Sequence, residues 1–205
     1  SASGRPRGPD SDCSPRRAPP RQVPDGPLSR KAPAKANLFL RILAREASGY
    51  HSLETLFCLL DLADDLTAER RPGDRVTIDV EGADVGPAPE NLAVRAAEMV
   101  LQATGRRFGV HLTLTKRIPV QAGLGGGSSD AAAALILVNQ LAGGPLPSHE
   151  LLQFAARLGS DVPFFLSEAR LARAWGHGER MLRLPPLPAA PALRLVPPEG
   201  MATAE

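Results

Sequence analysis

The chain has 205 residues, of which 43% are hydrophobic and 22% are charged, and its formal net charge at pH 7 is +2. This composition is typical of a globular protein with one large domain or two small ones. No apolar run approaches the roughly 20 residues of a membrane-spanning helix, so we expect no membrane association. Two cysteines, Cys13 and Cys58, cannot build a disulfide framework, which favours a reducing, cytoplasmic location.

Residues 1–30 form a tail that contains seven prolines, six arginines and few large apolar residues. Such a segment cannot bury enough apolar surface to offset the entropy lost on ordering, which predicts disorder. The tail carries a charge of +3 and the rest of the chain a charge of −1. The basic character therefore belongs to the tail, and we expect no nucleic-acid partner for the body.

The pattern changes at Lys31, and residues 31–190 read as one folded domain, with residues 191–205 as the start of another. Alternating or continuous apolar runs predict strands, and capping residues followed by a glycine predict helices. The expected strands cover residues 38–43, 53–60, 66–69, 75–80, 110–115, 171–175 and 181–184. Residues 70–74 are expected to join two of them in a hairpin, and residues 159–166 to form a turn and a short buried strand. The expected helices cover residues 92–104, 131–141 and 148–158.

A glycine-rich stretch lies between the strand at 110–115 and the apolar helix at 131–141. It holds four glycines in the five residues 123–127, and then Ser128, Ser129 and Asp130, which are favoured helix N-caps. Glycines followed by a helix N-terminus form an anion cradle, most often for phosphate. It is not a Walker A loop, because no lysine follows the glycines. A flexible linker is the alternative, but linkers are seldom held between a strand and a buried helix.

Two charged residues could support phosphate transfer to an alcohol. Asp161 lies in a glycine-led turn before Val162 and Pro163, where it could take the proton of an acceptor hydroxyl. Lys35 lies in a small, apolar stretch, and a nearby lysine would orient a carboxylate and counter phosphate charge. The residues alone leave plainer alternatives open: a turn-closing aspartate and an exposed edge-strand lysine.

Tyr50 and His51 follow a Ser-Gly turn and together could stack on a nucleobase and bind its edge. The alternative is a tyrosine packed on the sheet beside a solvated histidine. The four histidines, His51, His111, His149 and His177, show no metal-ligand spacing, so we expect no protein metal centre.

Four stretches together resemble one enzyme family. Residues 119–131 read Pro-x-x-x-Gly-Leu-Gly-Gly-Gly-Ser-Ser-Asp-Ala, which resembles the phosphate loop of the GHMP kinases, the galacto-, homoserine, mevalonate and phosphomevalonate kinases. Residues 33–40, 49–57 and 159–165 resemble, in order and spacing, the branch that acts on 4-diphosphocytidyl-2-C-methyl-D-erythritol. The resemblance covers about residues 31–179.

The resemblance implies an α+β domain like ribosomal protein S5 domain 2, with helices packed on a mostly antiparallel sheet. It implies ATP and Mg²⁺ as cofactors and phosphorylation of the substrate's 2-hydroxyl, a step of the non-mevalonate route to isoprenoid precursors. Asp161 falls on the catalytic base and Lys35 on its partner. The substrate-side positions are Asn37, Tyr50, His51 and Phe57, and the ATP-loop positions are Pro119, Gly123, Leu124, Gly125, Gly126, Gly127, Ser128 and Ser129.

Two features depart from the family pattern. Gln121 and Ala122 stand where small residues are usual, and the family continues for about one more domain, of the size into which chains usually split. We therefore expect weak nucleotide binding and slow turnover from this portion alone. Two alternatives stay open: another GHMP kinase of the homoserine or mevalonate type, and a non-catalytic nucleotide-binding fragment. The sequence does not fix the oligomeric state.

Overall fold

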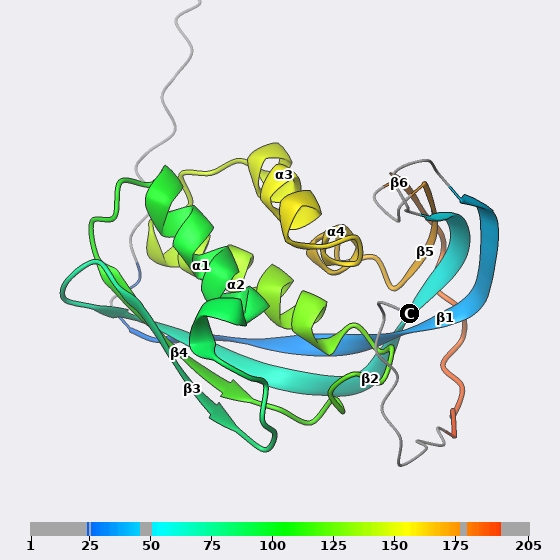
Figure 1. Cartoon of the computed structure of the whole chain (residues 1–205), viewed down its shortest axis with the longest axis horizontal. Coiled ribbons are helices and arrows are strands. Elements are labelled where there is room, and N and C mark those ends of the chain that lie inside the picture. Colours follow the sequence, from blue (N-terminus) through cyan, green and yellow to red (C-terminus); the bar gives the residue numbers. More distant parts are fainter. Residues whose placement is uncertain (1–23, 25, 46–50, 177–179, 194–205) are drawn as a thin grey trace, which may run out of the picture.

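A computed structural model describes residues 24, 26–45, 51–176 and 180–193. Within these residues, four α-helices lie on one face of a six-stranded sheet (Figure 1), as expected for an α+β protein. The strands are β1 (Leu28–Arg45), β2 (His51–Arg71), β3 (Val76–Glu81), β4 (Gly109–Thr115), β5 (Leu171–Gly176) and β6 (Arg180–Arg183). The helices are a short 3₁₀ turn (Ala88–Glu90), α1 (Leu92–Ala103), α2 (Gly126–Leu141), α3 (Ser148–Leu158) and α4 (Val162–Leu166). None of these helices is both long enough and apolar enough to span a membrane.

The sheet is organised around β2, the longest strand. β1 pairs with β2 in antiparallel register over nearly its whole length. The other edge of β2 is shared, because β4 pairs with residues 65–71 and β5 with residues 53–58. Residues 60–64 pair with neither strand, and there the register with β1 shifts from Pro33↔Ala63 to Lys35↔Leu59. The middle of β2 therefore bulges and leaves a gap in the edge between β4 and β5.

The expected hairpin around residues 70–74 is wrong. β3 does not pair with β2; it pairs in parallel with β4, which lies between them. Val110, Leu112 and Leu114 of β4 are fully buried, whereas the residues of β3 alternate between half-buried and exposed. The more apolar strand thus takes the central position. Gly109 permits this, because a Cβ there would lie 2.9 Å from the carbonyl oxygen of Arg75.

Helix α2 is the centre of the helical layer. Eleven of its 16 residues are buried, and it packs against β1, β2 and the other three helices (Figure 1). The helix begins earlier than expected: Gly125 is the N-cap, in the left-handed region with φ 69°. Ser128, Ser129 and Asp130 are therefore inside the helix and not its caps. Glycine takes a left-handed backbone at no steric cost, which explains why it outcompetes the serines.

The short buried strand expected within residues 159–166 is also wrong, because Val162–Leu166 form the short helix α4. Pro163 lies in its first turn, where the fixed φ of proline favours a helix. Phe164 and Phe165 are buried, so tertiary packing overrides their strand propensity.

The remaining expected helices and strands are present, but β1 and β2 are much longer than expected. Helices α1 and α3 are confirmed, and the Asn91 side chain caps α1 by accepting from the N–H of Ala93 at 2.9 Å. β5 and β6 form the expected antiparallel pair. The strands expected at 53–60 and 66–69 are one continuous strand, β2, and β1 begins at Leu28, inside the expected tail. The expected strand start near residue 193 lies mostly outside the described residues.

The central position of β4 can be tested by comparing two leucines. Leu112 is fully buried on β4, whereas Leu182 on β6 is 54% exposed. We expect Leu112→Ala to lower the free energy of unfolding by about 2–5 kcal/mol, because it removes buried methylenes and leaves a cavity. We expect Leu182→Ala to change it by less than about 1 kcal/mol. Urea denaturation of both variants measures the difference, and equal losses would contradict this strand order.

Candidate active site

The loop between β4 and α2, residues 119–125, is held against two side chains that come from distant parts of the chain. We call this segment the glycine loop. A Cβ on Gly125 would lie 2.9 Å from Cζ of Phe165 and 3.1 Å from Cγ of Lys35. With its left-handed φ as well, this position accepts only glycine without strain. The backbone of the loop therefore lies directly against Lys35 of β1 and Phe165 of α4, and α2 begins at the next residue, Gly126.

Lys35 is fixed through both its backbone and its side chain. Its N–H donates to the carbonyl oxygen of Leu124 in the glycine loop at 2.9 Å. Its ammonium donates to Oδ1 of Asn37 at 2.6 Å, lies 3.4 Å from Oδ2 of Asp161, and sits over the ring of Phe57 at 5.0 Å from the centroid. Lys35 is only 6% exposed, so it is not the solvated edge lysine of the plainer alternative.

Asp161 lies at the N-cap position of α4, but its side chain makes no capping hydrogen bond. It is thus not a carboxylate whose only role is to close its own turn. The side chain is 28% exposed and faces the ammonium of Lys35. The structure therefore brings together the two residues predicted to carry the chemistry, next to the glycine loop.

The predicted substrate-side residues are only partly described. Tyr50 lies outside the described residues, and His51 begins β2 without a described side chain. Asn37 is exposed on β1 and donates from Nδ2 to Oγ1 of Thr55 at 2.7 Å. Phe57 is 2% exposed and packs on Phe164, with ring centroids 4.9 Å apart. It lies beneath Lys35 and supports it from the core.

Sequence reasoning missed the buried residue Thr55. It is fully buried and its hydroxyl donates to the carbonyl oxygen of Phe39 at 2.7 Å. By accepting from Asn37 as well, it fixes the amide that in turn accepts from Lys35. Its alternation with the apolar residues Leu53 and Phe57 along β2 was the available signal.

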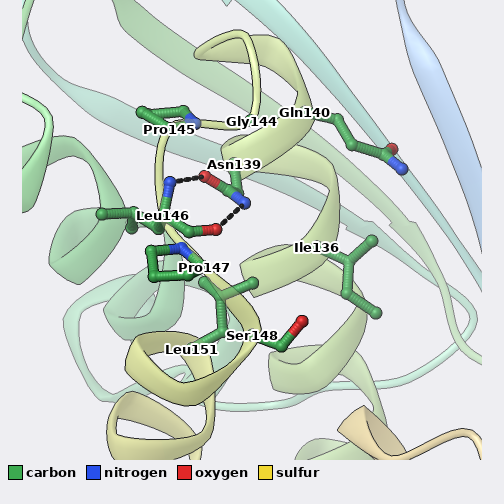
Figure 2. Close-up of a pocket in the computed structure, with 9 residues that line it drawn as sticks. All are labelled: Ile136, Asn139, Gln140, Gly144, Pro145, Leu146, Pro147, Ser148 and Leu151. Atoms are coloured by element: carbon green, nitrogen blue, oxygen red, sulfur yellow. Dashed lines mark hydrogen bonds between the residues drawn. The ribbon is translucent and has the colours of Figure 1, made fainter. Parts of the chain in front are cut away.

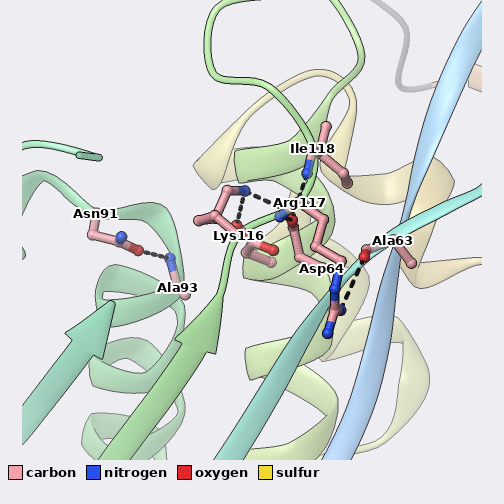
Figure 3. Close-up of polar contacts among 8 residues, drawn as sticks. Ala63, Asp64, Asn91, Ala93, Lys116, Arg117 and Ile118 are labelled. Atoms are coloured by element: carbon pink, nitrogen blue, oxygen red, sulfur yellow. Dashed lines mark hydrogen bonds and ion pairs between the residues drawn. The ribbon is translucent and has the colours of Figure 1, made fainter. Parts of the chain in front are cut away.

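A buried charged cluster behind the glycine loop was also missed (Figure 3). Lys116 donates to Oδ2 of Asp64 at 2.5 Å and to Oδ2 of Asp130 at 2.8 Å. Oδ1 of Asp64 accepts from the backbone N–H groups of Arg117 and Ile118 at 2.5 and 2.8 Å. The signals were a lysine directly after β4 and an aspartate two residues before the buried Leu66 of β2.

The charges in this cluster shift one another's protonation. Burial raises the pKa of Asp130 to about 7, although the nearby Lys116 opposes the shift. Burial works to lower the pKa of Lys116, but the two carboxylates outweigh it and raise that pKa overall.

Two cavities help to delimit the site. One, of about 510 Å³, is lined by uncharged residues at the C-terminal end of α2, where Asn139 exchanges two hydrogen bonds with the backbone of Leu146 (Figure 2). It lies about 20 Å along the helix from the glycine loop, at 1.5 Å per residue. A smaller cavity of about 310 Å³ shares Phe165 with the candidate site. Charge and geometry thus place the candidate active site at the N-terminal end of α2.

The chain is similar in sequence to known kinases. Residues 91–169 match the model of the GHMP kinases N terminal domain. The 4-diphosphocytidyl-2-C-methyl-D-erythritol kinase of Pelotomaculum thermopropionicum is 44% identical over 178 residues, which cover 87% of this chain and 62% of that protein. The kinase of the same name from Ralstonia pickettii is 45% identical over 159 residues, covering 76% of this chain and 54% of the relative.

Solved structures show the same fold. A crystal structure of 4-(cytidine 5'-diphospho)-2C-methyl-D-erythritol kinase matches 77% of this chain and 55% of its own, with a TM-score of 0.66 and 44% identity. Homoserine kinase from Cytophaga hutchinsonii matches with a TM-score of 0.58 at 20% identity, which supports the fold alone. The chain spans between half and two thirds of the length of these relatives. Over residues 91–169 it is similar to the N-terminal domain of the GHMP kinases, and the match to these relatives covers most of the chain.

Proposed function

We propose that this chain is the nucleotide-binding portion of a kinase that transfers the γ-phosphate of ATP to the 2-hydroxyl of 4-diphosphocytidyl-2-C-methyl-D-erythritol. The observation that carries the proposal is the pairing of Lys35 with Asp161, 3.4 Å apart, against the glycine loop. Relatives at 44–47% identity that bear the name of this kinase support the choice of substrate.

In the proposed mechanism the glycine loop and the N-terminal end of α2 hold the triphosphate. Unpaired N–H groups and the positive end of the helix dipole favour an anion there. Asp161 accepts the proton of the substrate hydroxyl as its oxygen attacks the γ-phosphorus. The bond between that phosphorus and the bridging oxygen of ADP breaks, so the products are ADP and the phosphate ester.

Lys35 serves two purposes in this mechanism. Its ammonium holds the Asp161 carboxylate in place through the 3.4 Å ion pair, and it counters negative charge that develops on the transferred phosphate. Asn37, Thr55 and Phe57 hold that ammonium in place. The fixed position matters because electrostatic stabilisation is strongest when the groups need not reorganise.

Mg²⁺ is expected as the companion of ATP. The described residues contain no group of three or more His, Cys, Asp or Glu side chains that could hold a metal ion. Mg²⁺ usually binds through substrate phosphates and water rather than in a protein cage, which fits this donor set. When bound, it would neutralise phosphate charge during transfer.

The setting that we propose is cytoplasmic, and the partner is a small molecule. Cys58 is a free cysteine, as is usual in reducing compartments. Outside the tail the chain carries a charge of only −1, which does not favour nucleic-acid binding. Two alternatives remain to be tested: a GHMP kinase for homoserine or mevalonate, and a nucleotide-binding fragment without activity.

The role of Asp161 can be tested by Asp161→Asn, in this chain and in this chain joined to the C-terminal part of the Pelotomaculum relative. We expect kcat to fall by roughly 10²- to 10⁴-fold, the usual contribution of a general base. Asp79→Asn is the matched control, because Asp79 has a side chain 77% exposed on β3. A coupled assay of ADP release measures both. Turnover within a few-fold of the unchanged enzyme would remove Asp161 from this role.

The substrate can be tested with a panel that contains 4-diphosphocytidyl-2-C-methyl-D-erythritol, mevalonate and homoserine. We expect ATP-dependent phosphorylation of the cytidyl compound alone, detected by phosphorus NMR of the product. Phosphorylation of mevalonate or homoserine instead would favour the first alternative. Binding of an ATP analogue in calorimetry, with no turnover even in the joined protein, would favour the second.

A further inference from the structure

The buried cluster of Lys116, Asp64 and Asp130 has no part in the proposed chemistry. The three residues are 8%, 0% and 3% exposed. Buried ion pairs seldom add net stability, because the cost of removing charges from water offsets their attraction. One negative charge is also left over when all three groups are ionised. An arrangement this costly, directly behind an anion cradle, suggests a role beyond holding the fold together.

The cluster contacts both ends of the glycine loop. On the entry side, Asp64 accepts from the N–H groups of Arg117 and Ile118, the residues immediately before the loop (Figure 3). On the exit side, Asp130 belongs to the first turns of α2. Lys116 joins the two carboxylates, and its Nζ lies 3.2 Å from where a Cβ on Gly126 would be. One ammonium thus supports the strand that enters the loop and the helix that leaves it.

We propose that Lys116 is a positioning residue for nucleotide binding, which sets the glycine loop at its binding geometry by bridging Asp64 and Asp130. The inference rests on the proposed function, in which this loop holds the triphosphate. Lys116 does not contact the nucleotide in this proposal; it acts through the backbone of residues 117, 118 and 126. Without the bridge, the first turn of α2 and the end of β4 are free to separate.

The surplus negative charge of the cluster offers a way to measure how the cluster is coupled to nucleotide binding. Oδ1 of Asp130 has no hydrogen-bond partner, and burial raises the pKa of this carboxyl to about 7. The charges that shift its pKa are those of Lys116, which follows β4, and Asp64, on β2. A triphosphate in the loop adds negative charge nearby, which favours the protonated form of Asp130 further. Nucleotide binding is therefore expected to take up a proton at Asp130 near and above pH 7.

The first experiment measures binding of a non-hydrolysable ATP analogue by calorimetry. Lys116→Met removes the bridging charge, and we expect affinity to fall by about tenfold or more, equivalent to about 1.4 kcal/mol. Lys31→Met is the matched control, because it removes the same charge from a side chain that is 77% exposed on β1. We expect the control to stay within about twofold of the unchanged chain, in line with the small effect of exposed charges.

The second experiment uses Asp130→Asn, which keeps the shape of the side chain and removes the surplus charge. The amide oxygen of the variant can still accept from Lys116, so the bridge remains while the charge that opposes a triphosphate is removed. We therefore expect the variant to bind the analogue several-fold more tightly than the unchanged chain at pH 8 and about equally at pH 6. Proton uptake, obtained from calorimetry in buffers of different ionisation enthalpy, should fall in the variant. The terminal phosphate of the analogue titrates in both proteins, so the difference between the two isolates Asp130.

Thermal unfolding gives an independent readout of the same proton. Asp130 binds its proton more tightly in the folded chain than in the unfolded one, because its pKa rises from 3.8 to about 7. Its contribution therefore makes folding less favourable as pH rises through this window. We expect Asp130→Asn to lose less stability than the unchanged chain between pH 4 and pH 7.

The outcomes separate this inference from the proposed function. If the unchanged chain and the joined protein bind no nucleotide, both fail. If they bind and Lys116→Met matches Lys31→Met in affinity, only the positioning role is overturned. If Lys116→Met does not fold, Asp130→Asn decides: an unchanged pH dependence of binding overturns the role, and a flattened one supports it.

Discussion

The gap in the edge of β2 is the constraint on which the candidate site depends. Residues 60–64 have no strand partner on that edge, since β4 ends before them and β5 begins after them. Backbone groups near a sheet edge need partners when they are buried. The carboxylate of Asp64 accepts from the backbone N–H groups of Arg117 and Ile118, and the N–H of Lys35 donates to the carbonyl oxygen of Leu124. The loop is therefore attached to both long strands, at the point where the register between them shifts.

A cluster of buried phenylalanines connects β2 to α4. Phe57 of β2 stacks against Phe164 at 4.9 Å, and Phe164 meets Phe165 edge-on at 5.3 Å. Because aromatic pairs have preferred geometries, this stack fixes the angle at which α4 leaves the core. The same stack supports the ammonium of Lys35 from below. A single packed unit thus holds Asp161, Lys35 and the glycine loop in a fixed relation.

Sequence patterns predicted those parts of the fold that depend on local signals. Asn91 marked the start of α1, and alternation identified β4, because both signals are set by neighbours in the chain. Pairing was beyond such reasoning: whether β3 joins β2 or β4 depends on which strand is more buried in the finished sheet. The helical state of residues 162–166 was missed for a similar reason, since five residues are too few for a period to show.

Some residues of the candidate site could likewise be predicted from the sequence, and others could not. The glycines, Lys35 and Asp161 could be proposed from their motifs, and the structure places them together. The cluster around Lys116 could not be, because it joins residues separated by 52 and 14 positions through contacts that only the folded sheet creates. These three charged residues stand out because they are buried, and burial makes each charge energetically costly. The sequence alone does not show which charged residues are buried.

The order of strands also determines when this domain can form during synthesis. The edge of β2 at residues 53–58 finds its partner only in β5, more than 110 residues later in the chain. Long-range pairing of this kind slows folding and leaves an unpaired apolar edge open to other chains meanwhile. Asp161 precedes β5 by only about ten residues. A ribosome must therefore release nearly all of the described residues before Asp161 can meet Lys35, so this ion pair is among the later contacts to form within the described fold.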